Sequence, residues 1–173
     1  MQTKKTHLPL LLVDRMLGKL SRYLRMAGYD AIYLREEIDQ VKEARRMRRI
    51  LITRDKIALS RCQKLHIPCI EVFDNYPEKQ FEEVLGKLGS FGKPLPYSRC
   101  IKCNEPLEKI LDKKLVEGWV PPFVYKTQEQ FKRCPACGRI FWKGTHRKKM
   151  DEIIEKSWHG SKIGLDKSSP YKK

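Results

Sequence analysis

The stretch LPLLLVDRMLGKLSRYLRMAG, residues 8–28, decides the fold class. Its first part, Leu8–Val13, is a continuous apolar run of the kind that forms a strand buried on both faces. Asp14 follows, and apolar side chains then recur at helical spacing from Arg15 to Ala27, with basic residues on the other surface. Gly28 is suited to end this helix. The stretch therefore predicts a strand, an acidic residue and an amphipathic helix in direct succession.

The same alternation continues along the chain to residue 88. Further strands are predicted at 29–34, 50–53 and 67–73, and further helices at 36–48, 56–65 and 78–88. Strands that alternate with helices form βαβ units, so we expect an α/β fold in which helices cover both faces of a parallel sheet. A stretch rich in Gly and Pro, residues 86–96, follows as a predicted linker.

Composition and charge narrow the choice of partner. The chain has 173 residues, and 40% of them are hydrophobic, which is enough for a packed domain and a small additional module. Its 37 Lys and Arg residues outnumber 21 Asp and Glu residues, so the net charge is +16. A protein this basic usually binds a polyanion, because neutralising phosphates releases condensed counterions. The alternative is a solvated, highly charged surface. We expect a nucleic acid as partner.

The sequence contains no run close to the roughly 18 apolar residues that a membrane-spanning helix needs. The basic start and the short apolar run before Asp14 resemble a secretory signal, but no small-residue cleavage site follows. Four of the six cysteines occur in two CxxC pairs, and Cys62 and Cys69 lie elsewhere. This usage is typical of an intracellular metal site rather than of a secreted disulfide framework. We expect a cytoplasmic protein.

Cys100, Cys103, Cys134 and Cys137 form the two CxxC pairs. Each pair can present two thiolates on one tight turn, and two such turns complete the tetrahedral shell of a structural zinc ion. Because four thiolates leave no position for water, we expect the ion to stabilise structure; a redox dithiol is the alternative for one pair alone. The sequence thus predicts an α/β domain at residues 1–90, a zinc ribbon at 97–150 and a basic, flexible tail at 151–173.

Two aspartates occupy equivalent positions in the first domain. Asp14 follows the first predicted strand directly, and Asp55 follows the strand Ile50–Thr53 with one residue between them. The carboxyl ends of parallel strands share one edge of a sheet, so the two carboxylates can converge there on Mg²⁺ or Mn²⁺. Such an ion activates water for phosphodiester hydrolysis. The alternative is that each aspartate only caps the helix that follows it.

The ordered motifs VDRMLGKLSRYLRMAGYD (13–30), ILITRD (50–55), RCIKCN (99–104) and CPACGRIFWKGTH (134–146) resemble one family. They are similar to the PIN-like ribonuclease domain with a zinc ribbon, which also forms the C-terminal RNase domain of Mut-seven-type exonucleases. The resemblance covers residues 8–150. It implies a PIN-like α/β/α domain, a metal-dependent endoribonuclease site of clustered acids, and a structural zinc ribbon. It places Asp14 and Asp55 on the acidic positions of the family and the four cysteines on its zinc ligands.

One segment departs from the family pattern. Between the second strand and ILITRD the family carries a longer stretch with an acidic turn, whereas this chain has LREEIDQVKEARRMRR, residues 34–49. The third acid is therefore open, and its candidates are Glu36, Glu37, Asp39 and, after the fourth strand, Asp74. Gln80 fits the family pattern as a structural residue. The residues predicted to contact RNA are basic and are Arg15, Arg22, Arg54, Lys56, Arg139, Lys143, Arg147 and Lys148.

Two functions follow as hypotheses. The first is a metal-dependent endoribonuclease that hydrolyses RNA phosphodiesters at Asp14, Asp55 and a third acid, Glu37 or Asp74. The second is an inactive RNA-binding or ribosome-associated zinc protein on the same fold, which the trimmed acidic segment favours. Both predict RNA as the partner, with tRNA, rRNA and mRNA as alternatives, and neither involves a membrane or a dinucleotide cofactor.

Overall fold

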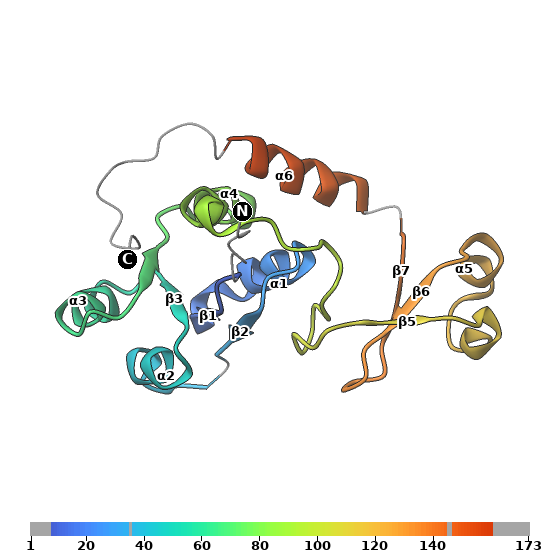
Figure 1. Ribbon diagram of the computed structural model, residues 1–173, viewed down its shortest axis with the longest axis horizontal. Coiled ribbons are helices and arrows are strands. Elements are labelled where there is room, and N and C mark those ends of the chain that lie inside the picture. The colour runs from blue at the N-terminus through green and yellow to red at the C-terminus, as the bar shows by residue number, and fades with distance from the viewer. Residues whose placement is uncertain (1–7, 35, 145–146, 161–173) are drawn as a thin grey trace, which may run out of the picture.

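The computed structural model describes residues 8–34, 36–144 and 147–160 (Figure 1). Its larger part, the body, is built on a four-stranded parallel sheet with the order β2-β1-β3-β4. The strands are β1 (Leu11–Val13), β2 (Ala31–Tyr33), β3 (Ile50–Thr53) and β4 (Cys69–Glu71). In the central strand, Leu12 pairs with Ile32 on one side and with Leu51 on the other. The predicted parallel sheet is confirmed.

Helices cover both faces of this sheet. They are the 3-10 helix η1 (Arg15–Leu17), α1 (Gly18–Met26), α2 (Gln40–Met47), α3 (Lys56–Lys64) and α4 (Pro77–Leu88). Successive side chains of a strand point to opposite faces. Leu11 and Val13 accordingly lie in one core with α1 and α4, whereas Leu12 lies in a second core with α2 and α3. The body therefore has the predicted three layers.

Two helix starts differ from the predictions because aspartates fix them. The first helix, predicted from residue 15, begins with the 3-10 turn η1, and Asp14 accepts a hydrogen bond from the backbone of Met16 within this turn. The second, predicted from residue 36, begins only at Gln40, because Asp39 accepts hydrogen bonds from the amides of Val41 and Lys42. Both aspartates satisfy amides that a helix start leaves unpaired.

The segment 86–96, predicted as a linker, begins within α4. This helix runs on to Leu88, because Leu85 and Leu88 are buried in the core against α1, and the short 3-10 helix η2 (Gly89–Phe91) follows. The chain then passes over the end of α1. Gly28 has a φ of +96° there, and a Cβ atom at this position would lie 2.2 Å from Leu95 O. Only glycine permits so close an approach.

A small antiparallel sheet forms the second part of the molecule, with the order β5-β6-β7. Its strands are β5 (Glu108–Ile110), β6 (Phe131–Arg133) and β7 (Ile140–Trp142), and two short helices, η3 (Lys113–Val116) and α5 (Pro122–Thr127), lie at one end. Val116, Val120 and Phe131 make its small core. We call residues 97–144 the ribbon; it projects to one side of the body (Figure 1).

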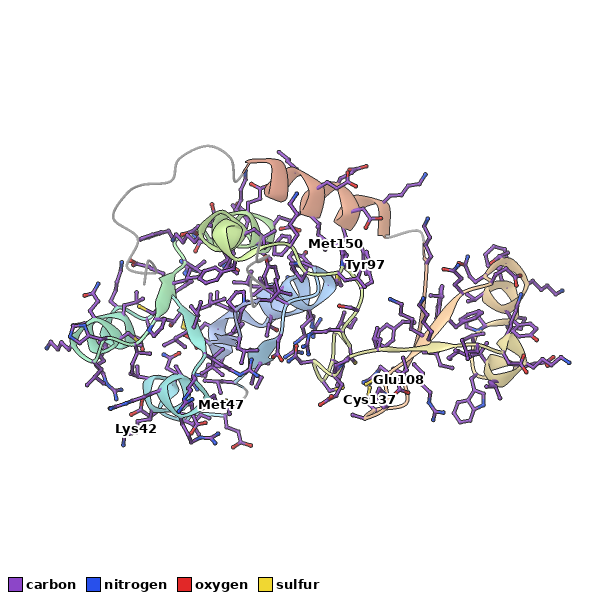
Figure 2. The ribbon with its side chains drawn as sticks, viewed as in Figure 1. Lys42, Met47, Tyr97, Glu108, Cys137 and Met150 are labelled. Atoms are coloured by element: carbon purple, nitrogen blue, oxygen red, sulfur yellow. The ribbon has the colours of Figure 1, made fainter. Side chains whose placement is uncertain are left out.

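The last helix, α6 (Arg147–Gly160), returns from the ribbon to the body and lies along α4 (Figure 1). Ile154 is 2% exposed in the core that α1 and α4 share. Near the start of α6, where Figure 2 labels Tyr97 and Met150, the Tyr97 hydroxyl donates to Asp151 Oδ1 at 2.7 Å. Like the other helices in the described part of the chain, α6 is too short and too polar to span a membrane.

The sequence predicts a flexible tail at 151–173 and, overlapping its start, a short helix at 148–156; the structure has a helix over residues 147–160. The reason is an apolar face: Met150, Ile153 and Ile154 pack against the core of the body, although lysines and glutamates surround them in sequence. Residues 161–173 lie outside the described residues.

Cys62 and Cys69, the two cysteines outside the CxxC pairs, belong to the core beneath α2 and α3. Burial raises the pKa of the Cys62 thiol to about 12, and its neighbour Cys69 adds to the effect. A thiol with so high a pKa is protonated at neutral pH and unreactive. These cysteines are packing residues.

Candidate functional site

The four CxxC cysteines come together in the ribbon. The Sγ atoms of Cys100, Cys103, Cys134 and Cys137 all lie within 4.8 Å of one another, with Cys103 and Cys134 at 3.3 Å and Cys100 and Cys137 at 3.7 Å. Thiolates around one tetrahedral zinc ion are about 3.8 Å apart, given a Zn–S bond of about 2.3 Å. The cluster therefore has the ligands and the spacing of a structural zinc site. Figure 2 shows Cys137 at the end of the ribbon away from α5.

The two cysteine turns have the same backbone geometry. The amide of Cys100 donates to Glu105 O, and the amide of Asn104 donates back to Cys100 O. In the second turn, Cys134 and Gly138 form the equivalent bonds, the first of them to Arg139 O. Asn104 and Gly138, the residues after each pair, both have a φ of +71°. A left-handed residue thus turns the chain behind each pair of thiolates, and glycine adopts this conformation without strain.

The first cysteine turn is bound tightly to the body. Arg25 of α1 is buried and donates to Ile101 O and Lys102 O inside the turn, at 3.0 and 2.9 Å. The side chain of Asn104 accepts the amide hydrogen of Ala31, the first residue of β2, at 3.0 Å. The turn therefore contacts the amino-terminal edge of the parallel sheet, which is the edge opposite Asp14 and Asp55.

Asp30, which precedes β2, connects the turn to further cations of the body. It accepts hydrogen bonds from Arg49 at 2.6 Å and from Asn104 at 2.8 Å, and it forms an ion pair with Arg99 at 3.2 Å. Burial raises the pKa of the Asp30 carboxyl, but these hydrogen bonds and charges together outweigh burial and hold the pKa below its usual value. Asp30 is therefore a charged structural residue.

At the carboxyl edge of the sheet, Asp14 and Asp55 lie in one cavity of about 160 Å³. The cavity is formed by the ends of β1 and β3, the segment after β2 and the first turn of α2. Its polar lining consists of Asp14, Arg15, Glu36, Glu37, Gln40 and Asp55. The structure thus brings together two of the predicted catalytic aspartates and the segment that departs from the family pattern.

Asp14 is held by hydrogen bonds on both of its oxygens. Oδ1 accepts the amide hydrogen of Met16 at 3.2 Å, and Oδ2 accepts the hydroxyl hydrogen of Thr53 at 2.6 Å. The same Thr53 hydroxyl accepts the amide hydrogen of Asp55 at 3.0 Å. Thr53, which is fully buried at the end of β3, therefore couples the positions of the two aspartates. Each carboxylate oxygen keeps a free lone pair.

Asp55 caps α3 and contacts Gln40 of α2. Its Oδ1 accepts the amide hydrogens of Ile57 and Ala58, and its Oδ2 accepts a hydrogen bond from Gln40 Nε2 at 3.4 Å. The other amide atom of this glutamine, Oε1, is buried and is the one buried side-chain oxygen or nitrogen of the described residues without a hydrogen-bond partner. Buried polar atoms without a partner are rare and costly. Gln40 itself lines the cavity, next to Asp55.

The candidates for the third acid lie in different places. Glu36 and Glu37 line the cavity, and Glu37 forms an exposed ion pair with Arg15 at 3.4 Å. Asp39 caps α2 and accepts a hydrogen bond from Arg61 at 2.7 Å. Asp74 follows β4 and lines a separate hollow beside the start of α4. Within the described residues, no set of three acidic side chains has its carboxylate oxygens within 4.8 Å of one another, whereas the four cysteines do have their Sγ atoms at such distances.

Comparison with protein families gives a match over residues 9–154, to the Mut7-C RNAse domain. The chain belongs to this family. The match includes the body, the ribbon and most of α6, and it confirms the predicted resemblance. Curated proteins and solved structures give no significant match. Membership in the Mut7-C RNAse domain family points to RNA as the substrate class.

The donor set of the cavity fits a hard divalent cation. Mg²⁺ and Mn²⁺ prefer carboxylate and amide oxygens. Asp14 and Asp55 supply carboxylates on adjacent strand ends, and Gln40 supplies an amide oxygen that no protein group satisfies. A cation bound by these residues would remove the unpaired buried oxygen. The residues of this Mut7-C RNAse domain are thus compatible with the metal that the resemblance implied.

The predicted RNA-binding cations fall into three groups. Arg15 is exposed on η1 and lines the cavity, and Arg22 is exposed on α1. On the other side of Asp55, Arg54 donates to Asn75 Oδ1 and Lys56 pairs with Glu71, so both are held by protein groups. The remaining residues lie in the ribbon and in α6, and they are Arg139, Lys143, Arg147 and Lys148. The side chain of Arg147 lies outside the described residues.

Sequence reasoning missed Gln40, Thr53 and Arg25. Thr53 stands in the quoted motif ILITRD, and its position before a candidate catalytic aspartate was the available signal. Gln40 directly follows Asp39. Because Asp39 caps α2, the helix begins at Gln40, and this places Gln40 at the cavity. Arg25 looks like one more surface cation of α1, because its backbone partners are distant in sequence.

Proposed function

We propose that the protein is a metal-dependent endoribonuclease that hydrolyses RNA phosphodiesters at the acidic cavity. One observation carries the proposal: Asp14, Asp55 and Gln40, whose buried Oε1 has no hydrogen-bond partner, line one cavity at the carboxyl edge of the sheet. Ligands of open α/β sheets bind at this edge. The family, a Mut7-C RNAse domain, supplies the reaction class.

Asp14, Asp55 and Gln40 would hold Mg²⁺ or Mn²⁺. When bound, such an ion supplies a more acidic water and stabilises negative charge on the phosphate oxygens. Thr53 keeps the Asp14 carboxylate oriented, and the first amides of α3 do the same for Asp55. Glu36 or Glu37, at the rim, provides the third carboxylate. Arg15 positions the phosphodiester by charge-assisted hydrogen bonds when it exchanges Glu37 for the substrate.

The test compares wild type with Asp14→Asn and Asp55→Asn, singly and together. Asn is as good a helix cap as Asp, so folding is retained while the carboxylate is lost. We expect cleavage of single-stranded RNA in Mg²⁺ or Mn²⁺ to fall at least a hundredfold, with unchanged zinc content. Asp112→Asn is the matched control, because Asp112 caps η3 in the ribbon through the same type of hydrogen bond. Cleavage that persists in the double variant rejects the proposed site.

A second function, RNA binding without cleavage, is favoured by the contacts of the acids. Asp14 and Asp55 both accept backbone amides, and Glu37 is paired with Arg15. These contacts also suit a protein that uses its aspartates only as caps. Wild-type protein that binds RNA with strong salt dependence, and cleaves none in Mg²⁺ or Mn²⁺, would establish this function. A ribosome-associated, cytoplasmic protein remains the corresponding proposal.

A further inference from the structure

We propose that single-stranded RNA leaves the acidic cavity along one exposed side of α1, over Arg15, Lys19 and Arg22, and continues towards the ribbon. This inference rests on the proposed function, since it specifies how the substrate of the same cavity is bound. We call these three side chains the α1 row. Arg15 lines the cavity, and Lys19 and Arg22 are exposed further along the chain on α1.

The spacing of the α1 row fits a helix surface. Residues three or four apart in sequence are neighbours on the same side of an α-helix, and Lys19 and Arg22 follow this spacing within α1. Arg15 lies just before them, in the 3-10 turn η1. All three are exposed, whereas Leu20 and Leu24 of the same helix are fully buried on the opposite side. At 1.5 Å per residue the row is roughly 10 Å long, which is enough to contact more than one phosphate of a strand.

The cations on the other side of the cavity are engaged with protein groups. Arg54 donates to Asn75 Oδ1 at 2.8 Å and to Phe73 O at 3.3 Å, and Lys56 pairs with Glu71. In the described part of the chain, the side chains of Lys19 and Arg22 form neither an ion pair nor a hydrogen bond. A phosphate can therefore bind the α1 row without first breaking a contact of Lys19 or Arg22.

The far end of α1 leads to the ribbon. Arg25, one turn after Arg22, is buried and holds the first cysteine turn through the carbonyls of Ile101 and Lys102. The side chain of Lys102 is exposed there, so the positive surface continues onto the turn. In Figure 1, α1 lies between the sheet of the body and the ribbon. A strand bound along α1 would thus run from the cavity to the cysteine turn.

A single row of cations matches one strand rather than a duplex. A positively charged path follows the backbone of a single strand, and such contacts carry no sequence information. Duplex RNA is instead contacted across its minor groove on both strands. The α1 row should therefore bind single-stranded RNA of different sequences with similar affinity.

The experiment measures RNA affinity against salt concentration. Full-length, zinc-loaded protein with Asp14→Asn, which prevents cleavage, is titrated with a labelled single-stranded oligoribonucleotide and with a duplex of the same length. A variant that also carries Lys19→Ala and Arg22→Ala is compared with it. Each phosphate contact to a single strand contributes about 0.7 to the slope of log affinity against log salt, so two lost contacts lower the slope by about 1.4. We expect affinity for the single strand to fall about tenfold or more.

The matched control carries Arg45→Ala and Lys64→Ala. It loses the same charge from exposed positions on α2 and α3, away from the α1 row. We expect its affinity and salt slope to stay within about twofold of the parent. Lys19→Gln and Arg22→Gln, which keep longer polar side chains, repeat the measurement should the alanine variant unfold. Equal losses in the α1 row variant and the control, or an equal loss for the duplex, overturn the inference.

The outcomes separate this inference from the proposed function. If cleavage depends on Asp14 and Asp55 but the α1 row variant binds RNA as well as the control variant does, the proposed RNA path is overturned and the proposed nuclease function is retained. Wild type that binds single strands through the α1 row but cleaves none in Mg²⁺ or Mn²⁺ overturns the nuclease and leaves the path.

Discussion

Asn104 Nδ2 lies 2.8 Å from Asp30 Oδ1, and this hydrogen bond joins the residue after the first cysteine pair to the residue before β2. The same asparagine also accepts the amide hydrogen of Ala31 through its side-chain oxygen. Both amide atoms of one side chain are thus used to attach a metal turn to a parallel sheet. The stability of the sheet edge and the order of the metal turn should therefore depend on each other.

Replacing Asn104 with Gly tests this attachment. Gly adopts a φ of +71° without strain, so the change removes only the side chain. The buried amide of Ala31 then loses its partner, and we expect the free energy of unfolding to fall by about 1–3 kcal/mol in urea titrations. Gly138→Asn at the equivalent position of the second turn is the control: a Cβ atom there meets nothing closer than 4.0 Å, and Asn tolerates the φ of +71° better than most other residues, so we expect a smaller loss. A loss in the control as large as that in Asn104→Gly would contradict the assignment.

Removal of the metal should loosen the same edge. Thiolate ligands hold the first cysteine turn, and without an ion the turn loses most of its folding free energy. We therefore expect a chelator to speed hydrogen exchange of the Ala31 amide, which donates to Asn104. The Leu51 amide, which donates to Pro68 O inside the sheet, is the internal control and should stay protected. Unchanged exchange at Ala31 after complete loss of zinc would show that the turn is ordered without metal.

Gly28→Ala should destabilise the protein strongly. The added Cβ would lie 2.2 Å from Leu95 O, and the φ of +96° is unfavourable for alanine. We expect a loss of roughly 2 kcal/mol or more in the free energy of unfolding. Gly86→Ala is the matched control, since Gly86 lies in α4 with nothing within 4 Å of the new Cβ. Gly86→Ala should stabilise the helix by about 0.5–1 kcal/mol. The same type of substitution is thus expected to lower the free energy of unfolding at Gly28 and to raise it at Gly86.

The pH dependence of Asp39 distinguishes a structural acid from a catalytic one. The hydrogen bond from Arg61 is the largest cause that lowers the pKa of Asp39, and the amides of Lys42 and Val41 lower it further. A lowered pKa contributes stability above the unfolded value, about 3.9, and that stability is lost as the pH falls through the folded value. We expect the ¹³C titration midpoint of the Asp39 carboxyl to lie below 3.9 and to rise in Arg61→Gln. If the Asp39 midpoint in Arg61→Gln were the same as in wild type, the pairing of Asp39 with Arg61 would be contradicted.

Asp39→Asn provides the control for that measurement. It keeps a good helix cap but removes the titrating group and its ion pair with Arg61, so we expect a small loss of stability at pH 7 and no change in RNA cleavage. Loss of cleavage in Asp39→Asn would instead make Asp39 the third acid of the site.

Local patterns predicted the parts of the molecule that depend on nearby residues. The two CxxC pairs specify their turns within five residues, so the four ligands were predictable from spacing. Asp14 and Asp55 were predictable as neighbours, because parallel strands put their carboxyl ends on one edge. Gln40 was not, since its position depends on where α2 begins, and a single cap at Asp39 moves that start by four residues from the predicted one.

Tertiary contacts decided the remaining differences. Arg25, which looks like a surface cation of α1, is buried because carbonyl groups distant in sequence accept its hydrogen bonds. Ile154 is buried in the core of the body, so part of the segment predicted as a flexible tail packs there. The sequence pattern predicted helices at 78–88 and 148–156, and it is their packing against the body that depends on distant residues.

Because Ile154 anchors α6 in the core of the body, the ribbon is an insertion fastened at both of its ends and not an appendage. Tyr97 at its entrance and Asp151 just beyond its exit are even joined to each other by a hydrogen bond. A protease cut within the ribbon would accordingly yield two pieces that stay associated, and deletion of everything after the second cysteine pair would uncover the apolar surface of α4.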